Sequence, residues 1–339
     1  MASEPRAECS RSDVADTRRQ SPSVQDQALG HTANRPGGIP LRGWRAVLGR
    51  VWREASSDDL TMVAAGCAFY ALLALFPALS VLISVYGLLL DPAAVEEQLA
   101  AVRDLLPAAT YDMIAGRVHD LVAARDTRLG WSLVFGLMLA LWSTMAGTKA
   151  MMTALNVAYE EDEKRGFVRF NLIAILFTLG GIAGISLALS IIVGLPTILG
   201  FAWLGPLANL ALRLVSWALL VGFLIFGLAV LYRYGPSRRG AKWRWITPGS
   251  MLVAVLWLAA SLLFSFYVAN FANYDVTYGS LGAVVVALMW LYISALIVLV
   301  GAELNAELEL QTWRDTTLGP VKPMGQRGAF VADHVADAR

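Results

Sequence analysis

The sequence contains little charge for its length. Of its 339 residues, 16% are charged and 57% are hydrophobic, whereas about a quarter of the residues in an average soluble domain are charged. The formal net charge is +1, so no overall basic field indicates a nucleic-acid partner, and none is expected. This composition favours a membrane protein.

Residues that bind metals or form disulfides are also scarce. The two cysteines are Cys9, in a polar tail, and Cys67, in an apolar segment, so neither a disulfide framework nor a thiolate metal site is expected. The three histidines, His31, His119 and His334, are too far apart in the chain for ligand-type spacing. The sequence therefore predicts no metal site and no cofactor.

The recognisable motifs of soluble enzymes are missing. The sequence has no phosphate-binding Walker loop, no GxSxG nucleophile elbow and no HExxH zinc motif. A nuclease requires clustered carboxylates for two metals. The densest acidic run, residues 160–163, is followed at once by Lys164 and Arg165, which is typical of a solvated helix end. We therefore expect that the chain is not an enzyme.

Long apolar runs dominate the rest of the chain. The last of them, Leu281 to Gly301, has no charged residue and is long enough to cross the roughly 30 Å hydrocarbon layer as a helix. Soluble core helices rarely stay apolar on every face for this length. The fold class predicted is all-α, a polytopic domain over residues 41–310. Its six transmembrane helices are predicted at about 62–90, 131–150, 170–199, 207–232, 246–270 and 281–303.

Three further segments complete this prediction. Residues 43–54 carry Trp on one face and Arg on the other, which indicates an N-terminal helix in the membrane interface, or else a helix packed on protein. Residues 91–128 are expected to form two short periplasmic helices, either a cap over the bundle or a mobile lid. The polar tails, residues 1–40 and 311–339, are expected to be cytoplasmic, the first of them disordered and not a signal peptide.

Lysine and arginine in the short connections set the orientation. They precede the first span and lie between the second and third spans and between the fourth and fifth. Because such residues stay on the cytoplasmic side, both termini are predicted to be cytoplasmic.

Polar residues at the ends of the spans are the first candidates for a functional site, because ionisable groups at membrane depth are costly. Asp59 precedes the first span, Lys149 and Asn156 end the second, and Glu303 and Asn305 end the sixth. A pair of Lys149 with Glu303 or Asp59 would close an inner gate. Alternatively, each side chain reaches the headgroups or caps a helix end.

Four more residues are candidates for a transport path or gate. Tyr70 lies within the first span and needs a hydrogen-bond partner, and Pro77 breaks that span. Arg213, near the outer end of the fourth span, is placed to meet an anionic headgroup or substrate, or only the outer interface. Tyr278 lies at the outer mouth between the last two spans.

The chain resembles the YihY/BrkB family of bacterial inner-membrane proteins, formerly described as ribonuclease BN. The similarity covers about Trp44 to Leu310, and its most specific block lies near the C-terminus. Four blocks carry it: Asp59-Leu60 to Phe76-Pro77; Trp142-Ser143 to Ala158-Tyr159; Tyr232-Arg233-Tyr234-Gly235-Pro236 with Pro248-Gly249; and Tyr278-Gly279-Ser280-Leu281-Gly282 with Trp290-Leu291-Tyr292 and Gly301-Ala302-Glu303-Leu304-Asn305-Ala306.

This resemblance implies a six-helix inner-membrane bundle and no defined catalytic residue set. Family members are linked to serum resistance and to envelope lipid export. Our leading hypothesis is a transporter or a lipid-handling protein that exports or flips membrane lipids. The alternative is a non-transporting membrane scaffold or envelope regulator, and ribonuclease activity is disfavoured. Gly180, Gly181 and Gly184 form a GxxxG-type pattern for tight helix contact, which permits a homo-oligomer without requiring one.

Overall fold

The computed structural model describes residues 24–89, 131–200, 206–271 and 282–336, and these are almost entirely helical. Their only β-pairing is an isolated bridge between Ala241 and Thr317. The long helices are α3 (Leu41–Ser57), α4 (Leu60–Leu89), α7 (Trp131–Ala158), α8 (Phe167–Gly200), α9 (Pro206–Tyr234), α10 (Trp243–Phe271) and α12 (Gly282–Leu310). The short ones are α2 (Val24–Leu29), η1 (Pro36–Gly38) and α13 (Phe330–Asp333).

Four of these helices, α8, α9, α10 and α12, are long and apolar enough to cross a membrane. A fifth span is added if α3 and the first part of α4, which meet at a 64° bend, count together as one. The all-α prediction is therefore confirmed for the described residues. The total of six spans stays a prediction, and the predicted insert at residues 91–128 lies outside the described residues.

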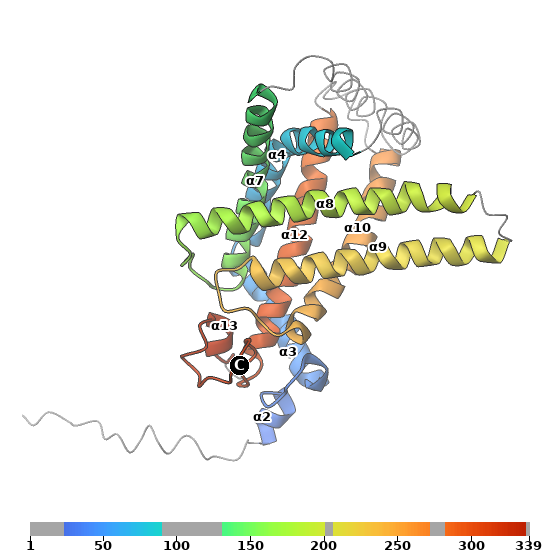
Figure 1. The fold of residues 1–339 in the computed structure, drawn as a ribbon. Helices are drawn as coiled ribbons and strands as arrows, with labels where there is room; N and C mark the ends of the chain where they lie inside the picture. The colour runs from blue at the N-terminus through green and yellow to red at the C-terminus, as the bar shows by residue number, and fades with distance from the viewer. Residues whose placement is uncertain (1–23, 90–130, 201–205, 272–281, 337–339) are drawn as a thin grey trace, which may run out of the picture.

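The long helices do not form one parallel bundle. In Figure 1, α7, α10 and α12 run in a similar direction, while α8 and α9 lie beside each other and cross that direction. Two of the candidate spans are thus steeply inclined to the other two. This crossing sets α8 and α9 against α7 and α10 along only part of their length, so much of their apolar surface is not covered by protein.

Helix α12 is the centre of the packing, since it contacts α3, α4, α7 and α10. Its residues Leu299 and Ala302 are buried in a core shared with Leu60 of α4, Leu155 of α7 and Tyr232 of α9. The Tyr232 hydroxyl donates a hydrogen bond of 2.7 Å to the carbonyl of Val298, which satisfies a polar group that would otherwise be costly inside the core.

Helices α10 and α12 touch at two glycines. A Cβ atom on Gly249 would lie 2.2 Å from the carbonyl oxygen of Gly301, and one on Gly301 would lie 2.2 Å from Val253. The Gly249 amide donates a 2.8 Å hydrogen bond to the Asn305 side chain. Small residues at this crossing therefore let the two backbones approach closely.

Helix α4 changes direction near Pro77. Its blue N-terminal part is upright in Figure 1, whereas its teal C-terminal part turns across the molecule. Pro77 lies inside the helix and lacks the amide hydrogen needed for the regular hydrogen bond, which is a usual cause of such a bend. The helix itself continues through the residue, as expected for a kinked span.

Part of the predicted tails is ordered. Residues 24–40, which the sequence assigns to a disordered segment, form α2 and η1. They meet the chain after α12, because Thr312 donates hydrogen bonds to the carbonyls of His31 and Ala33, at 3.0 and 2.8 Å. Gln311 donates another, of 2.8 Å, to Leu29. Burial between the two tails supplies the order that the polar N-terminal sequence alone does not indicate.

Helix α3 packs on protein along one face, and its place in a membrane interface stays a prediction. Val47 and Val51 are buried against Leu304 and Leu308 of α12, as for a helix packed on protein. Trp52, on the same amphipathic helix, is 80% exposed, as expected for an interfacial anchor.

Candidate functional site

The polar side chains gather where α7, α9 and α12 end, in a region that we call the polar layer (residues 156–165, 233–242 and 303–317). Asn156 connects two of its loops: its amide nitrogen donates to Glu163 at 3.0 Å, and its oxygen accepts from the Ser237 amide at 2.7 Å. The Lys164 amide in turn donates to the Ser237 hydroxyl at 2.9 Å. Asn156 therefore fastens the α7–α8 loop to the α9–α10 loop.

Glu163 is the ionised centre of this connection. Although burial by itself would raise its pKa, hydrogen bonds from Arg165 and Asn156 lower the pKa of Glu163 to about 2. Arg165 reaches both carboxylate oxygens, at 2.7 and 2.6 Å. Nη2 of Arg165 also donates a hydrogen bond of 2.9 Å to the carbonyl of Gly235. The Arg165–Glu163 pair therefore holds the α7–α8 loop against the end of α9.

Two further ion pairs lie deeper in the polar layer. Arg238 and Glu309 are fully buried, with a contact of 2.6 Å, and Thr316 donates to the other Glu309 oxygen at 2.6 Å. Arg50 of α3 pairs with Glu307. Glu307, Glu309 and their arginine partners were not among the candidates from the sequence. The spacing of Glu303, Glu307 and Glu309 after the last apolar run is the sequence feature that could have indicated them.

The gate pair proposed from the sequence is not formed. The Lys149 amino group lies 4.6 Å from the centre of the Trp142 ring, a cation–π contact on its own helix. Glu303 is 3% exposed, and its Oε2 has no hydrogen-bond partner in the described structure. Its charged neighbours include Asp58 and Glu307, which are carboxyls themselves. Among the described residues, Glu303 therefore forms no ion pair with a cation.

The remaining predicted residues are dispersed. Asp59 is exposed and adopts φ 48° at the start of α4, where its carbonyl accepts hydrogen bonds from Met62 and Val63. Tyr70 is 47% exposed and meets the Phe69 ring edge-on.

Arg213 lies in α9, but its side chain is not described, and Tyr278 lies outside the described residues. Of the nine predicted residues, Asn156, Glu303 and Asn305 belong to the polar layer.

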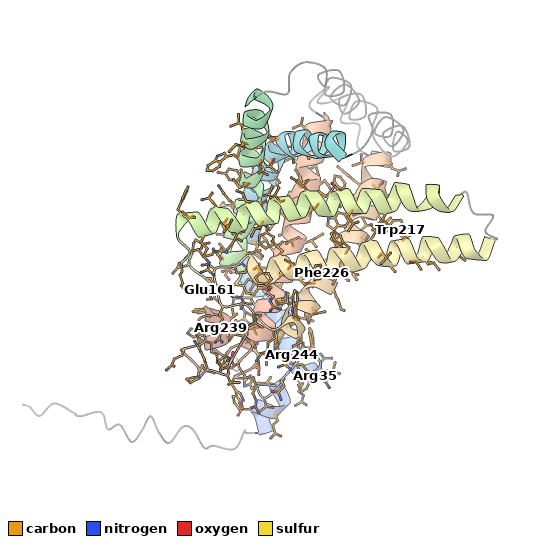
Figure 2. All side chains as sticks on the ribbon, in the orientation of Figure 1. Arg35, Glu161, Trp217, Phe226, Arg239 and Arg244 are labelled. Atoms are coloured by element: carbon orange, nitrogen blue, oxygen red, sulfur yellow. The ribbon has the colours of Figure 1, made fainter. Side chains whose placement is uncertain are left out.

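A long groove opens between α8 and α9, and the sequence did not predict it. It has a volume of about 1570 Å³ and mostly apolar walls, with α7 and α10 contributing at its sides. Small-molecule pockets measure roughly 300–1,000 Å³. From α8 it is lined by Arg169, Ile173, Leu176, Phe177, Gly180, Gly181, Gly184, Ile185 and Ala188. Figure 2 shows Trp217 and Phe226 of α9, which also line it, at separate points along its length.

Glycines keep this groove open. A Cβ atom on Gly180, Gly181 or Gly227 would meet nothing within 4 Å, and all three residues line the groove. Only Gly184 is close to the opposite helix, since its Cβ would lie 2.9 Å from the Phe223 ring. The GxxxG-type pattern was expected to bring helices together. In the structure most of it instead leaves space between them.

Basic residues lie at the end of the groove that adjoins the polar layer. Arg169, Arg233 and Arg239 line it there, and none of them forms an ion pair in the described part of the chain. Arg233 is buried, with its guanidinium 4.3 Å from the centre of the Trp243 ring. The groove is therefore amphipathic, with apolar walls along α8 and α9 and positive charge at one end.

Most of the chain matches a known protein family. The family described as "Virulence factor BrkB" matches residues 51–323. The chain belongs to the BrkB family. The match includes the helices that form both the polar layer and the groove.

The relatives of this chain differ in what their names suggest. The chain is 31% identical to a "Putative ribonuclease-like protein YfkH" of Bacillus subtilis, over 71% of this chain and 87% of the relative. It is 27% identical to a "UPF0761 membrane protein" of Photobacterium profundum, over 79% and 83%. A Chlorobium phaeobacteroides relative with the same description is 29% identical, over 74% of this chain and 55% of the relative. No solved structure matches.

The described residues contain no group of three or more His, Cys, Asp or Glu side chains that could hold a metal ion. The site offers an apolar groove, guanidinium groups that form no ion pair among the described residues, and a hydrogen-bonded polar layer beside them. Such a combination suits an amphipathic molecule with one anionic end.

Proposed function

We propose that this BrkB-family membrane protein handles lipids, either flipping them across the bacterial cytoplasmic membrane or passing them on for export. The observation that supports this proposal most directly is the open groove between α8 and α9. It is larger than a pocket for a small metabolite, and its walls are apolar. Along α8, from Arg169 to Ala188, the groove extends about 30 Å at 1.5 Å per residue.

The exposure of the surrounding helices also supports a lipid ligand. Leu176 and Ile185 of α8, like Trp217 and Phe226 of α9, are more than half exposed. Large apolar side chains of this kind have a favourable environment among acyl chains. A lipid could therefore enter the groove from the side without first passing through water.

The movement would be passive or coupled to an ion gradient, because the sequence has no ATP-binding motif. The full-length protein should be reconstituted in vesicles that contain a fluorescent phospholipid, and its transbilayer movement should be followed by quenching from outside. We expect the rate to rise several-fold above that of protein-free vesicles.

A matched pair of glycine variants tests the groove itself. Gly181 and Gly222 both have open space around a Cβ position, but only Gly181 lines the groove. Gly181→Leu should fill the groove and slow lipid movement without unfolding the protein, whereas Gly222→Leu should leave the rate unchanged. Equal rates in vesicles with and without protein would contradict lipid transfer.

We further propose that the protein has no nuclease activity, although one relative has a ribonuclease-like name. Purified protein incubated with RNA and divalent cations should leave the RNA intact. Metal-dependent cleavage that is lost on replacing a carboxylate of the polar layer would overturn this view.

A further inference from the structure

We infer that Arg233, together with Arg169 and Arg239, binds the phosphate of an anionic phospholipid whose acyl chains lie in the α8–α9 groove. This inference rests on the proposed lipid-handling function and adds the ligand class and the headgroup site. It assigns a role to three residues that the sequence did not single out.

The environment of Arg233 is the strongest argument. Arg233 is only 8% exposed, yet its Nε and Nη1 have no hydrogen-bond partner in the described structure. The guanidinium instead lies 4.3 Å from the centre of the Trp243 ring and 5.4 Å from that of Tyr234. A buried charge without a counter-ion is costly, and the aromatic rings compensate only part of that cost. A bound anion would supply the missing partner.

Arg169 and Arg239 add charge at the same end of the groove. Arg169 is exposed on the first turns of α8, and Arg239 follows α9 in the loop before α10. Nη1 of Arg239 is buried and has no hydrogen-bond partner among the described residues. Figure 2 shows Arg239 beyond the ends of α8 and α9, on the opposite side of the groove from Trp217. Guanidinium groups bind phosphate with two parallel hydrogen bonds, which suits this position.

The nearby carboxylates are already occupied. Glu163 is held by Arg165 at 2.6 Å, and Glu161 by Lys164 at 2.9 Å and by the Phe330 amide at 2.6 Å. Glu309 is held by Arg238. These contacts neutralise Lys164, Arg165 and Arg238, the other basic residues that line the groove, and leave the three groove arginines for an external anion.

The continuity of the groove selects a lipid over a soluble anion. A free phosphate would use only the basic end and leave the apolar walls of Ile173, Leu176 and Phe177 in contact with solvent or membrane. An anionic phospholipid covers both parts, because its phosphate and its chains are linked at the polar–apolar boundary. The phosphate of the lipid would therefore lie at the basic end of the groove, and its acyl chains along the apolar walls.

Lipid binding to the full-length protein in a neutral detergent tests this assignment. Dioleoyl phosphatidylglycerol and dioleoyl phosphatidylcholine carry the same chains, so their affinity ratio reports the headgroup alone. We expect the wild type to bind the anionic lipid about tenfold more tightly, and Arg233→Gln to reduce the ratio to within about twofold. Arg233→Lys should keep part of the preference, because it keeps the charge and loses the planar fork.

Arg244→Gln is the matched control, since Arg244 is exposed, lies on the first turn of α10 and does not line the groove. It should leave the ratio unchanged. If Arg233→Gln does not fold, the double variant Arg169→Gln/Arg239→Gln carries the test, because Arg169 is at the surface and Arg239 is half-buried in a loop. It should lower the same ratio.

The outcomes separate the two proposals. If Gly181→Leu weakens binding of both lipids but Arg233→Gln and the double variant leave their ratio unchanged, the headgroup site is wrong while the groove stands. If Gly181→Leu changes neither affinity, the groove does not bind lipid and both proposals fail. Displacement of bound lipid by inorganic phosphate alone would show a soluble-anion site. A dimer disrupted by Gly181→Leu with no lipid bound would assign the groove to a second copy of the chain.

Discussion

Single residues of the polar layer show how charge is tolerated at the end of a membrane helix. Arg238 and Glu309 are both completely buried, and each contacts the other at 2.6 Å. The Arg238 guanidinium also lies 4.2 Å from the centre of the Tyr159 ring. Two buried charges are acceptable only when paired, so the stability of this region depends on keeping both.

Removing one member of this pair should be strongly destabilising. We expect Glu309→Leu to lower the free energy of unfolding by about 3–5 kcal/mol, since Arg238 would be left as a buried charge. Thermal unfolding in detergent measures the change. The double variant Arg238→Met/Glu309→Leu should lower the free energy of unfolding by less than Glu309→Leu alone does. A double variant that is the least stable of the three would contradict this explanation.

The Glu163 connection predicts a specific dependence on pH. The pKa of Glu163 is lowered from 4.5 to about 2 in the folded protein. Its contribution to stability is therefore complete above pH 4.5 and is lost as the pH falls from 4.5 toward 2. We expect the wild type to be more stable than Glu163→Gln at neutral pH, with a difference that shrinks across this window. Unfolding midpoints measured from pH 7 downward test this; a constant difference would argue against the assignment.

At the scale of the helices, glycine has two opposite roles. Gly249 and Gly301 bring α10 and α12 into contact, whereas Gly180 and Gly181 face open space. Both sets look alike in the sequence, as small residues in apolar helices. Which of them permits contact and which leaves a groove depends on the neighbouring helix, and that information is tertiary.

The contact glycines should tolerate no side chain. A Cβ on Gly249 would lie 2.2 Å from a backbone oxygen of α12, which cannot move aside as a flexible side chain would. We expect Gly249→Ala to destabilise the protein by about 1–3 kcal/mol or more, as overpacking does. Gly222→Ala, with nothing near its Cβ, is the control and should be neutral or slightly stabilising. Equal melting temperatures for the two variants would show that the helices can separate at no cost.

At the scale of the whole molecule, the two tails form one assembly with α12. Thr312 binds the backbone of His31 and Ala33, and Arg50 pairs with Glu307. The chain segments that precede α3 and follow α12 are therefore on the same side of the molecule, as Figure 1 shows for α2 and α13.

This arrangement predicts the topology that the basic residues also indicate. Reporter fusions at the N-terminus and after residue 339 should both report a cytoplasmic location. Fusions placed within residues 91–128 should report the periplasm. A cytoplasmic N-terminal reporter together with a periplasmic C-terminal reporter would mean an odd number of crossings, which the contact between the tails does not allow.

The sequence by itself determined the helical class, the positions of the main apolar helices and the polar ends of α7 and α12. It could do so because a helix must satisfy its own backbone hydrogen bonds, and the lengths of its apolar runs are local properties.

Only the tertiary structure decided that α8 and α9 cross the other helices, that glycines border a groove, and that Lys149 contacts Trp142 and not Glu303. The helix crossing and the groove depend on contacts between residues far apart in the chain, and a periodic apolar pattern has the same form whether the facing surface is another helix or a lipid. The Lys149–Trp142 contact lies within α7, but which partner Lys149 takes depends on where Glu303 of α12 is placed.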